Sequence, residues 1–128
     1  MGSYAKDLSR WPIAVLRVEG TLDDAQIDAF VTDGTDMLSR RERYVVVFDL
    51  SAMGIPTAYA RGRSLQWQKE QYDALGQYCL GTVYVMPSPI VRFISMTIFM
   101  LARPPSPFRV CEGIDEAIAW AEQQLTKR

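Results

Sequence analysis

Five consecutive β-branched and aromatic residues, at positions 44–48, lie between a charged segment and a short polar stretch. An apolar run of this length, without alternating polar positions, indicates a strand buried on both faces in the middle of a parallel sheet. In open sheets of this kind, the functional site lies on the loops that leave the carboxyl ends of the strands. We therefore expect a polar site on the loop after this strand, formed by Asp49, Ser51, Thr57 and Arg61.

Three further apolar segments have the length and composition of strands. They cover residues 13–19, 81–86 and 108–111, and turn or charged residues border them. Residues 4–10 are weakly patterned and form either a short edge strand or a lead-in to the first long strand. The sequence thus predicts four or five strands.

Residues 24–40 have the pattern of an amphipathic helix. Asp23 followed by Gln26 is a capping box, and apolar residues then recur at helical spacing at Ile27, Phe30, Val31 and Leu38. Gly34 lies inside this apolar face, where it costs about 1 kcal/mol relative to alanine. We expect Gly34 to allow a close approach to the strands; a merely tolerated glycine is the alternative.

A second helix is predicted from about residue 57 to residue 78. It is longer than a small sheet needs, so its far part either projects or bends near Gly76. Trp67 lies off its main face and packs either against a neighbouring helix or on a partner protein. That main face is less clearly apolar than the face of the first helix, and it contains Ala58, Arg61, Leu65, Gln68, Tyr72, Leu75 and Cys79.

The helix predicted at residues 90–102 has a surplus of apolar side chains, because a helix resting on a sheet needs only one apolar stripe. Three interpretations remain open: burial inside the monomer, a homodimer or partner interface, and contact with an apolar ligand or a membrane surface. Few basic residues accompany it, which favours a protein interface over a membrane. The candidate residues for the interface or the apolar ligand are Ile90, Phe93, Ile94, Thr97, Phe99, Met100 and Trp67.

A last amphipathic helix is predicted at residues 114–126, after Gly113. Strands and helices therefore alternate along most of the chain, which is typical of right-handed crossover connections. The fold class is α/β, with a mainly parallel sheet of four or five strands covered by about four helices. A chain of 128 residues corresponds to one domain, covering residues 1–128.

The composition narrows the chemistry. The net charge is −1 and no long cluster of lysine and arginine occurs, so we expect no nucleic-acid partner. The chain contains no histidine, the commonest general base and metal ligand, and its cysteines are not closely spaced. We therefore expect no enzyme activity, no metal and no cofactor.

Cys79 and Cys111 lie in apolar segments, which favours reduced core thiols in a cytoplasmic protein. The N-terminal residues show no hydrophobic signal core. The longest apolar stretch is interrupted by Arg92 and is too short to span a membrane, so we expect no transmembrane segment.

Several short motifs, in this order, resemble STAS domains, the fold of the anti-sigma factor antagonists. Gly-Thr-Leu-Asp at 20–23 is similar to a turn of that family, and Val-Val-Phe-Asp-Leu-Ser at 46–51 to its central strand. Pro-Ser-Pro-Phe-Arg-Val at 105–110 and the helix after it resemble the end of small bacterial STAS/CRAL-TRIO-like proteins. The resemblance covers about residues 4–125.

The resemblance implies a non-enzymatic regulatory module that acts by contact with a protein partner or with a second copy of itself. In the antagonists, the loop after Asp-Leu-Ser carries a phosphorylated serine. Thr57 is the hydroxyl in register here, without the family's acidic residue and glycine, and Thr57 and Ser51 are the candidate phosphorylation sites. The alternative, which the CRAL-TRIO resemblance allows, is a binding protein for a lipid or other apolar small molecule.

Overall fold

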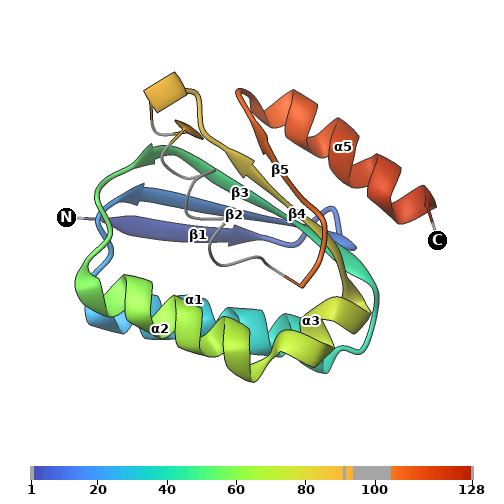
Figure 1. Ribbon diagram of the computed structural model, residues 1–128, viewed down its shortest axis with the longest axis horizontal. Helices are drawn as coiled ribbons and strands as arrows, with labels where there is room; N and C mark the ends of the chain where they lie inside the picture. Colours follow the sequence, from blue (N-terminus) through green and yellow to red (C-terminus); the bar gives the residue numbers. More distant parts are fainter. Residues whose placement is uncertain (1, 91, 94–104, 128) are drawn as a thin grey trace.

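The computed structural model describes residues 2–90, 92–93 and 105–127. It contains one five-stranded sheet with the spatial order β1-β2-β3-β4-β5 (Figure 1). β1 pairs antiparallel with β2, and every other neighbouring pair is parallel. The strands are β1 (Ser3–Asp7), β2 (Ile13–Gly20), β3 (Tyr44–Met53), β4 (Cys79–Val85) and β5 (Phe108–Cys111). The expected mainly parallel α/β sheet is confirmed, and residues 3–7 form an edge strand.

β3 is the central strand, as the apolar run at residues 44–48 predicts. It lies between β2 and β4, and Val45 and Val47 are completely buried. The strand continues to Met53, beyond the end of the apolar run, because residues near its end still pair with β2. The loop therefore begins later than the sequence suggests.

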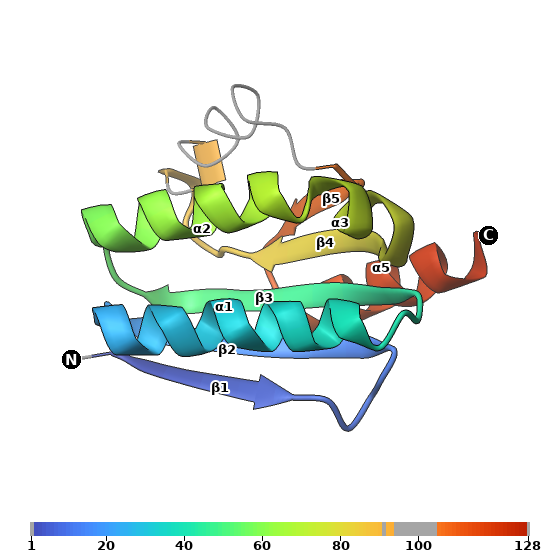
Figure 2. The same cartoon turned by 90° about the horizontal axis from the view of Figure 1, so that it is seen from below.

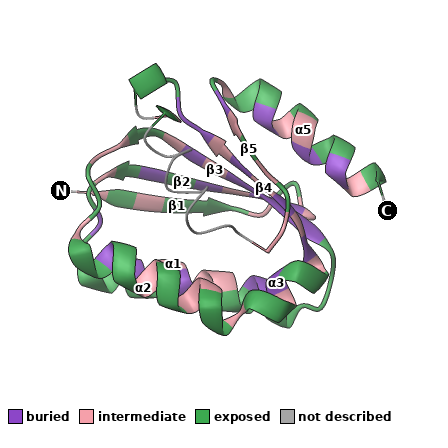
Figure 3. Ribbon diagram, in the orientation of Figure 1, coloured by how far each residue is buried: buried purple, intermediate pink, exposed green. Residues whose placement is uncertain are grey.

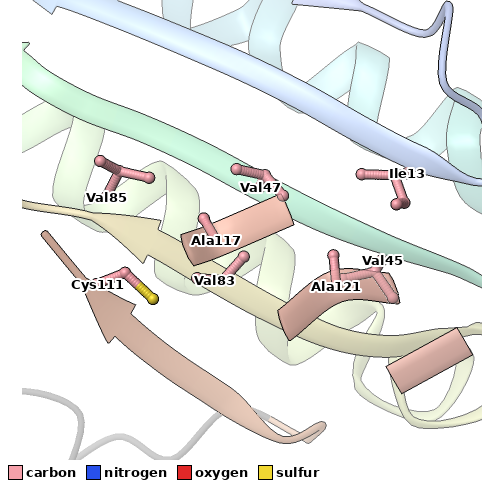
Figure 4. Close-up of a cluster of buried hydrophobic side chains, with 8 residues drawn as sticks. All are labelled: Ile13, Val45, Val47, Val83, Val85, Cys111, Ala117 and Ala121. Carbon is pink, nitrogen blue, oxygen red and sulfur yellow. The ribbon is translucent and has the colours of Figure 1, made fainter. Parts of the chain in front are cut away.

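The two faces of the sheet are covered by different helices. α5 (Ile114–Thr126) covers one face, and α1 (Asp24–Ser39), α2 (Ala58–Glu70) and α3 (Tyr72–Tyr78) lie on the other (Figures 1 and 2). On the α5 face, Ala117 and Ala121 are completely buried against valines of β3 and β4 (Figure 4). Small side chains on both sides allow the helix to lie close to the strands.

The opposite face is built from larger side chains. Four aromatic rings follow one another across it, with centroid distances of 5.3 Å from Tyr4 to Phe30, 5.8 Å from Phe30 to Phe48 and 5.3 Å from Phe48 to Tyr84. The sides of α1 and α2 that point away from the sheet are mostly exposed (Figure 3). This face therefore has a core of its own beneath the three helices.

α1 begins as its sequence predicts: Asp23 accepts a hydrogen bond from the backbone of Gln26, whose side chain accepts one in return. The glycine inside this helix has a different role from the one expected. A Cβ atom at Gly34 would lie 2.9 Å from the ring of Trp67, so the close approach is to α2 and not to the strands. The Trp67 ring nitrogen also donates a hydrogen bond of 2.9 Å to the Thr35 hydroxyl.

The long helix predicted at residues 57–78 is wrong in two respects. It is two helices, α2 and α3, which meet at Gln71 and not at Gly76. Its main face is also not buried as a unit: Leu75 and Cys79 are buried, whereas Leu65 and Tyr72 are 41% and 51% exposed. The physical reason is that α2 packs against α1, so that only a narrow edge of α2 reaches the sheet side of the molecule.

The last strand and helix agree with the sequence: β5 is found at the predicted residues, and α5 begins after Gly113. The helix predicted at 90–102 is described only at Ile90, Arg92 and Phe93, which are helical. Its remaining positions, including the candidate residues Ile94, Thr97, Phe99 and Met100, lie outside the described residues.

Candidate functional site

The predicted loop site begins inside a strand. Asp49 and Ser51 belong to β3 and not to the loop after it, because β3 remains paired with β2 past both residues. Asp49 follows Val45 and Val47 at the two-residue period of a strand, so its side chain belongs to the α5 face of the sheet. The Asp49 carboxylate is therefore a buried group on the α5 face of the sheet.

Asp49 is held by three hydrogen bonds. Its Oδ1 accepts from the Ser51 backbone N–H at 3.2 Å and, at close range, from the Ser51 hydroxyl. Its Oδ2 accepts from Nε of Arg17 at 3.2 Å, across the register that sets Arg17 beside Asp49. Burial alone would raise the pKa of Asp49, but the hydrogen bonds from Ser51 and the charge of Arg17 outweigh it and hold that pKa below its ordinary value. The group is therefore an ionised, well-partnered carboxylate.

Thr57 and Arg61 lie at the start of α2. Thr57 is the N-cap, and its hydroxyl accepts a hydrogen bond of 3.0 Å from the Ala60 backbone N–H. One terminal nitrogen of Arg61 donates to the backbone oxygen of Pro56 at 2.7 Å. The N-terminus of a helix favours negative charge, and Arg61 adds a full positive charge there.

The four predicted loop residues are thus not brought together. Asp49 and Ser51 face the α5 side, whereas Thr57 and Arg61 begin a helix on the opposite side of the sheet. Two separate polar places result. The sequence does not reveal this division, because its apolar run ends at Phe48 and so suggests that all four residues share one loop.

Arg17 also belongs to this polar place, although it is not among the site residues predicted from the sequence. Arg17 follows Ile13 and Val15 at the two-residue period of a strand, so it lies with them on the α5 face of the sheet. A charged residue at such an otherwise apolar set of positions is the feature of the sequence that indicates a polar site. The partner of Arg17 could not be deduced, because it depends on the register between β2 and β3.

The described residues contain no group of three or more acidic, histidine or cysteine side chains that could hold a metal ion. Both cysteines are free and buried, and burial raises the pKa of each thiol. Such thiols are poor nucleophiles. In the portion that the structure describes, no helix is sufficiently long and apolar to cross a membrane.

The predicted interface residues that the structure describes differ in their exposure to solvent. Ile90 and Phe93 are 73% and 75% exposed, and Ile55, which the sequence argument did not select, is 83% exposed. These side chains follow the neighbouring parallel strands β3 and β4, at the carboxyl edge of the sheet. Trp67, in contrast, is half-buried against α1 and does not belong to this exposed group.

A cavity of about 400 Å³ lies between the sheet and the helices α1 and α2. Its lining is mainly apolar and includes Leu16, Val46 and Phe48 from the sheet. The volume is within the range of small-molecule sites, and the apolar lining is typical of them. An apolar ligand between the helix predicted at residues 90–101 and the sheet stays a prediction, because most of that helix lies outside the described residues; Pro105 and Ser106, which follow it in the sequence, line this cavity.

Comparison with known proteins finds likeness only at the level of structure. No family model matches the sequence, and no curated protein matches it significantly. An uncharacterised DUF3478-family protein with a SpoIIAA-like fold, from Shewanella loihica PV-4, superposes with a TM-score of 0.73 and 11% identity, over 94% of this chain and 93% of that one. The chain described here has a SpoIIAA-like fold.

Two anti-sigma factor antagonists share the fold. SpoIIAA in its unphosphorylated form has a TM-score of 0.67 and 15% identity, and the match covers 94% of this chain and 98% of that chain. An antagonist from Mycobacterium paratuberculosis has a TM-score of 0.60 and 16% identity, over 95% of each chain. The STAS-like architecture expected from the short motifs is therefore confirmed, at identities that establish the fold alone.

Proposed function

We propose that this chain is a non-enzymatic regulatory module that acts by binding another protein through the carboxyl edge of its sheet. The observation that carries the proposal is the exposure of Ile55, Ile90 and Phe93 at this edge. These side chains follow two neighbouring parallel strands, and exposed large apolar side chains are found on protein-binding surfaces. The SpoIIAA-like fold supports the proposal, because two structural neighbours are described as anti-sigma factor antagonists.

A phosphate on Thr57 would regulate this surface. It would lie at the N-terminus of α2, next to Arg61 and close in sequence to Ile55, where two negative charges are favoured. Ser51 is the weaker candidate, because its hydroxyl already contacts the Asp49 carboxylate and a phosphate there would meet a like charge. Phosphopeptide mapping from native cells tests the choice; absence of phosphate on Thr57 under several growth conditions contradicts it.

The partner-binding surface is tested by photocrosslinking in the native cytoplasm. A benzoylphenylalanine at position 93, 90 or 55 is expected to give a discrete crosslinked product, either with a second protein or with another copy of this chain. The same probe at Glu122, an exposed position of α5, is the control. Crosslinking that is no stronger at the three edge positions than at position 122 contradicts the proposal.

The homodimer is one form of this proposal. Sedimentation at rising protein concentration is expected to show reversible dimers, which Phe93→Ser should weaken because it removes an exposed aromatic side chain. A strict monomer at high concentration excludes the homodimer and leaves a second protein as the partner.

The cavity favours a second candidate function, the binding of an apolar small molecule. It lies on the α2 side of the sheet, so its occupant is independent of the edge residues 90 and 93. Native mass spectrometry of freshly purified protein would show the extra mass of a retained ligand.

A further inference from the structure

The cavity between the sheet and α2 extends along the whole of β3. Tyr44 and Met53, the first and last residues of β3, both line it, so it follows a strand of ten residues, or roughly 30 Å at the rise of a β-strand. Its volume is about 400 Å³. A cavity of this volume and length can hold one extended hydrocarbon chain better than a compact ring system.

The only charged side chain among the described lining residues is Arg61. It lies in the first turn of α2 and is exposed to solvent. Its one described hydrogen bond is to the Pro56 backbone oxygen, and no described carboxylate forms an ion pair with it. The guanidinium group can therefore bind an anion where the cavity meets the surface.

The opposite end of the cavity contains a buried phenol. Tyr44 is 1% exposed and lines the cavity, and its ring stacks on that of Trp11 with a centroid distance of 5.4 Å. The ring gives this end of the cavity an apolar wall, which suits the end of a hydrocarbon chain.

From these three observations we infer that the cavity binds a single-chain anionic amphiphile. The negatively charged head lies at Arg61, at the start of α2, and the apolar chain extends along β3 toward Tyr44. This inference rests on the second candidate function proposed above and specifies its ligand class.

A free fatty acid and a lysophospholipid share this chemistry. Both head groups carry one negative charge, which the single guanidinium group of Arg61 matches; the carboxylate needs no further polar partner, whereas the glycerol of the lysophospholipid does, so we expect the fatty acid to be preferred. Titration with palmitate and with a lysophosphatidylglycerol that carries the same acyl chain distinguishes a fatty acid from a lysophospholipid. Palmitate is expected to bind more tightly. Tighter binding of the lysophospholipid would assign the site to a phospholipid chain and overturn the carboxylate assignment.

The test uses the full chain after removal of bound lipid, with cis-parinaric acid as a fluorescent probe and palmitate as its competitor. Trp67 lines the cavity, so energy transfer from tryptophan to the bound probe is expected. Saturable binding that palmitate reverses supports the proposal. If neither cis-parinaric acid nor palmitate binds, the inference is overturned; the second candidate function is overturned only if native mass spectrometry also shows no retained ligand.

Two matched pairs of variants locate the ligand. Ser64→Phe places a ring in the cavity from α2, whereas Gln66→Phe adds the same ring on the exposed side of that helix. We expect Ser64→Phe to weaken palmitate binding at least tenfold and Gln66→Phe to leave it unchanged. Circular dichroism and thermal unfolding confirm that each variant is folded, and equal palmitate affinity in two folded variants overturns the location.

The head group is tested with Arg61→Gln and its control Arg63→Gln, which removes the same charge from a residue that does not line the cavity. Arg61→Gln is expected to weaken palmitate binding about tenfold, as for the loss of one charged hydrogen bond, and to leave hexadecanol binding unchanged. If palmitate and hexadecanol bind equally and Arg61→Gln affects neither, the anionic ligand is overturned, while the second candidate function stands.

Discussion

The two faces of the sheet are packed with different kinds of side chain. On the α5 face, valines of β3 and β4 meet Ala117 and Ala121, all of them fully or almost fully buried (Figure 4). On the opposite face, aromatic rings lie on the strands, α2 rests on α1, and a cavity of about 400 Å³ remains. One face is therefore suited to stability, and the other has space for a ligand.

The largest expected difference between the two faces comes from adding volume. Ala117→Leu inserts a larger side chain into the closely packed α5 face, so we expect it to lower the free energy of unfolding by about 3 kcal/mol. Ala60→Leu points into the cavity, so we expect a change of less than about 1 kcal/mol, or a small gain in stability. Urea unfolding measures both, and equal destabilisation would show that the faces are packed alike.

Shortening a side chain should also destabilise the α5 face more than the cavity side, but the difference in the free energy of unfolding should be smaller. Val46 and Val47 are neighbours on β3, but Val46 lines the cavity and Val47 belongs to the α5 cluster. Val47→Ala is expected to cost about 2 kcal/mol, because the loss of two methyl groups is followed by a new void in a closely packed site. Val46→Ala should cost about 1 kcal/mol, because it only enlarges an existing space. A larger cost for Val46→Ala in denaturant unfolding would contradict this comparison.

The ion pair on the α5 side should make a small, pH-dependent contribution. The pKa of Asp49 is lower in the folded protein than in the unfolded chain, so its carboxylate stabilises the fold above pH of about 4, and this contribution is lost as the pH falls through the folded-state pKa. Because Arg17 is more than half exposed, Arg17→Gln should cost less than about 1 kcal/mol at neutral pH. Arg63→Gln, whose guanidinium nitrogen lies 3.9 Å from an Asp28 oxygen, is the surface control.

Chemical unfolding from pH 7 to pH 3 measures this contribution. The cost of Arg17→Gln should shrink as the pH decreases, while the smaller cost of Arg63→Gln should change less. A cost of Arg17→Gln that does not depend on pH would show that the Asp49 carboxylate is not its partner.

The elements with a strong local signal were predictable from the sequence. The apolar run of β3, the capping box of α1 and the regular apolar face of α5 each specify an element without knowledge of the rest of the chain. The order of these elements then implies a mainly parallel sheet. The fold class was confirmed because it depends on these local signals and on the handedness of the connections.

The predictions that were wrong concern features that depend on contacts between segments far apart in the sequence. The inner side of α2 could not be deduced, because Trp67 packs on Gly34 of another helix and not on the sheet. The pairing of Asp49 with Arg17 requires the strand register, and the cavity requires the distance between α2 and β3. These features decide where the candidate sites lie. The sequence therefore indicated the chemical character of the sites better than their location in the fold.

The most direct test of the difference between the two faces is a methyl NMR titration of valine-labelled protein with palmitate. Val18 and Val46 line the cavity, whereas Val47 and Val83 are buried beneath α5. The methyl signals of Val18 and Val46 are expected to shift saturably with palmitate, and those of Val47 and Val83 to remain in place. Shifts that are equal on the two faces, or absent from both, would contradict a ligand site on the α2 side of the sheet.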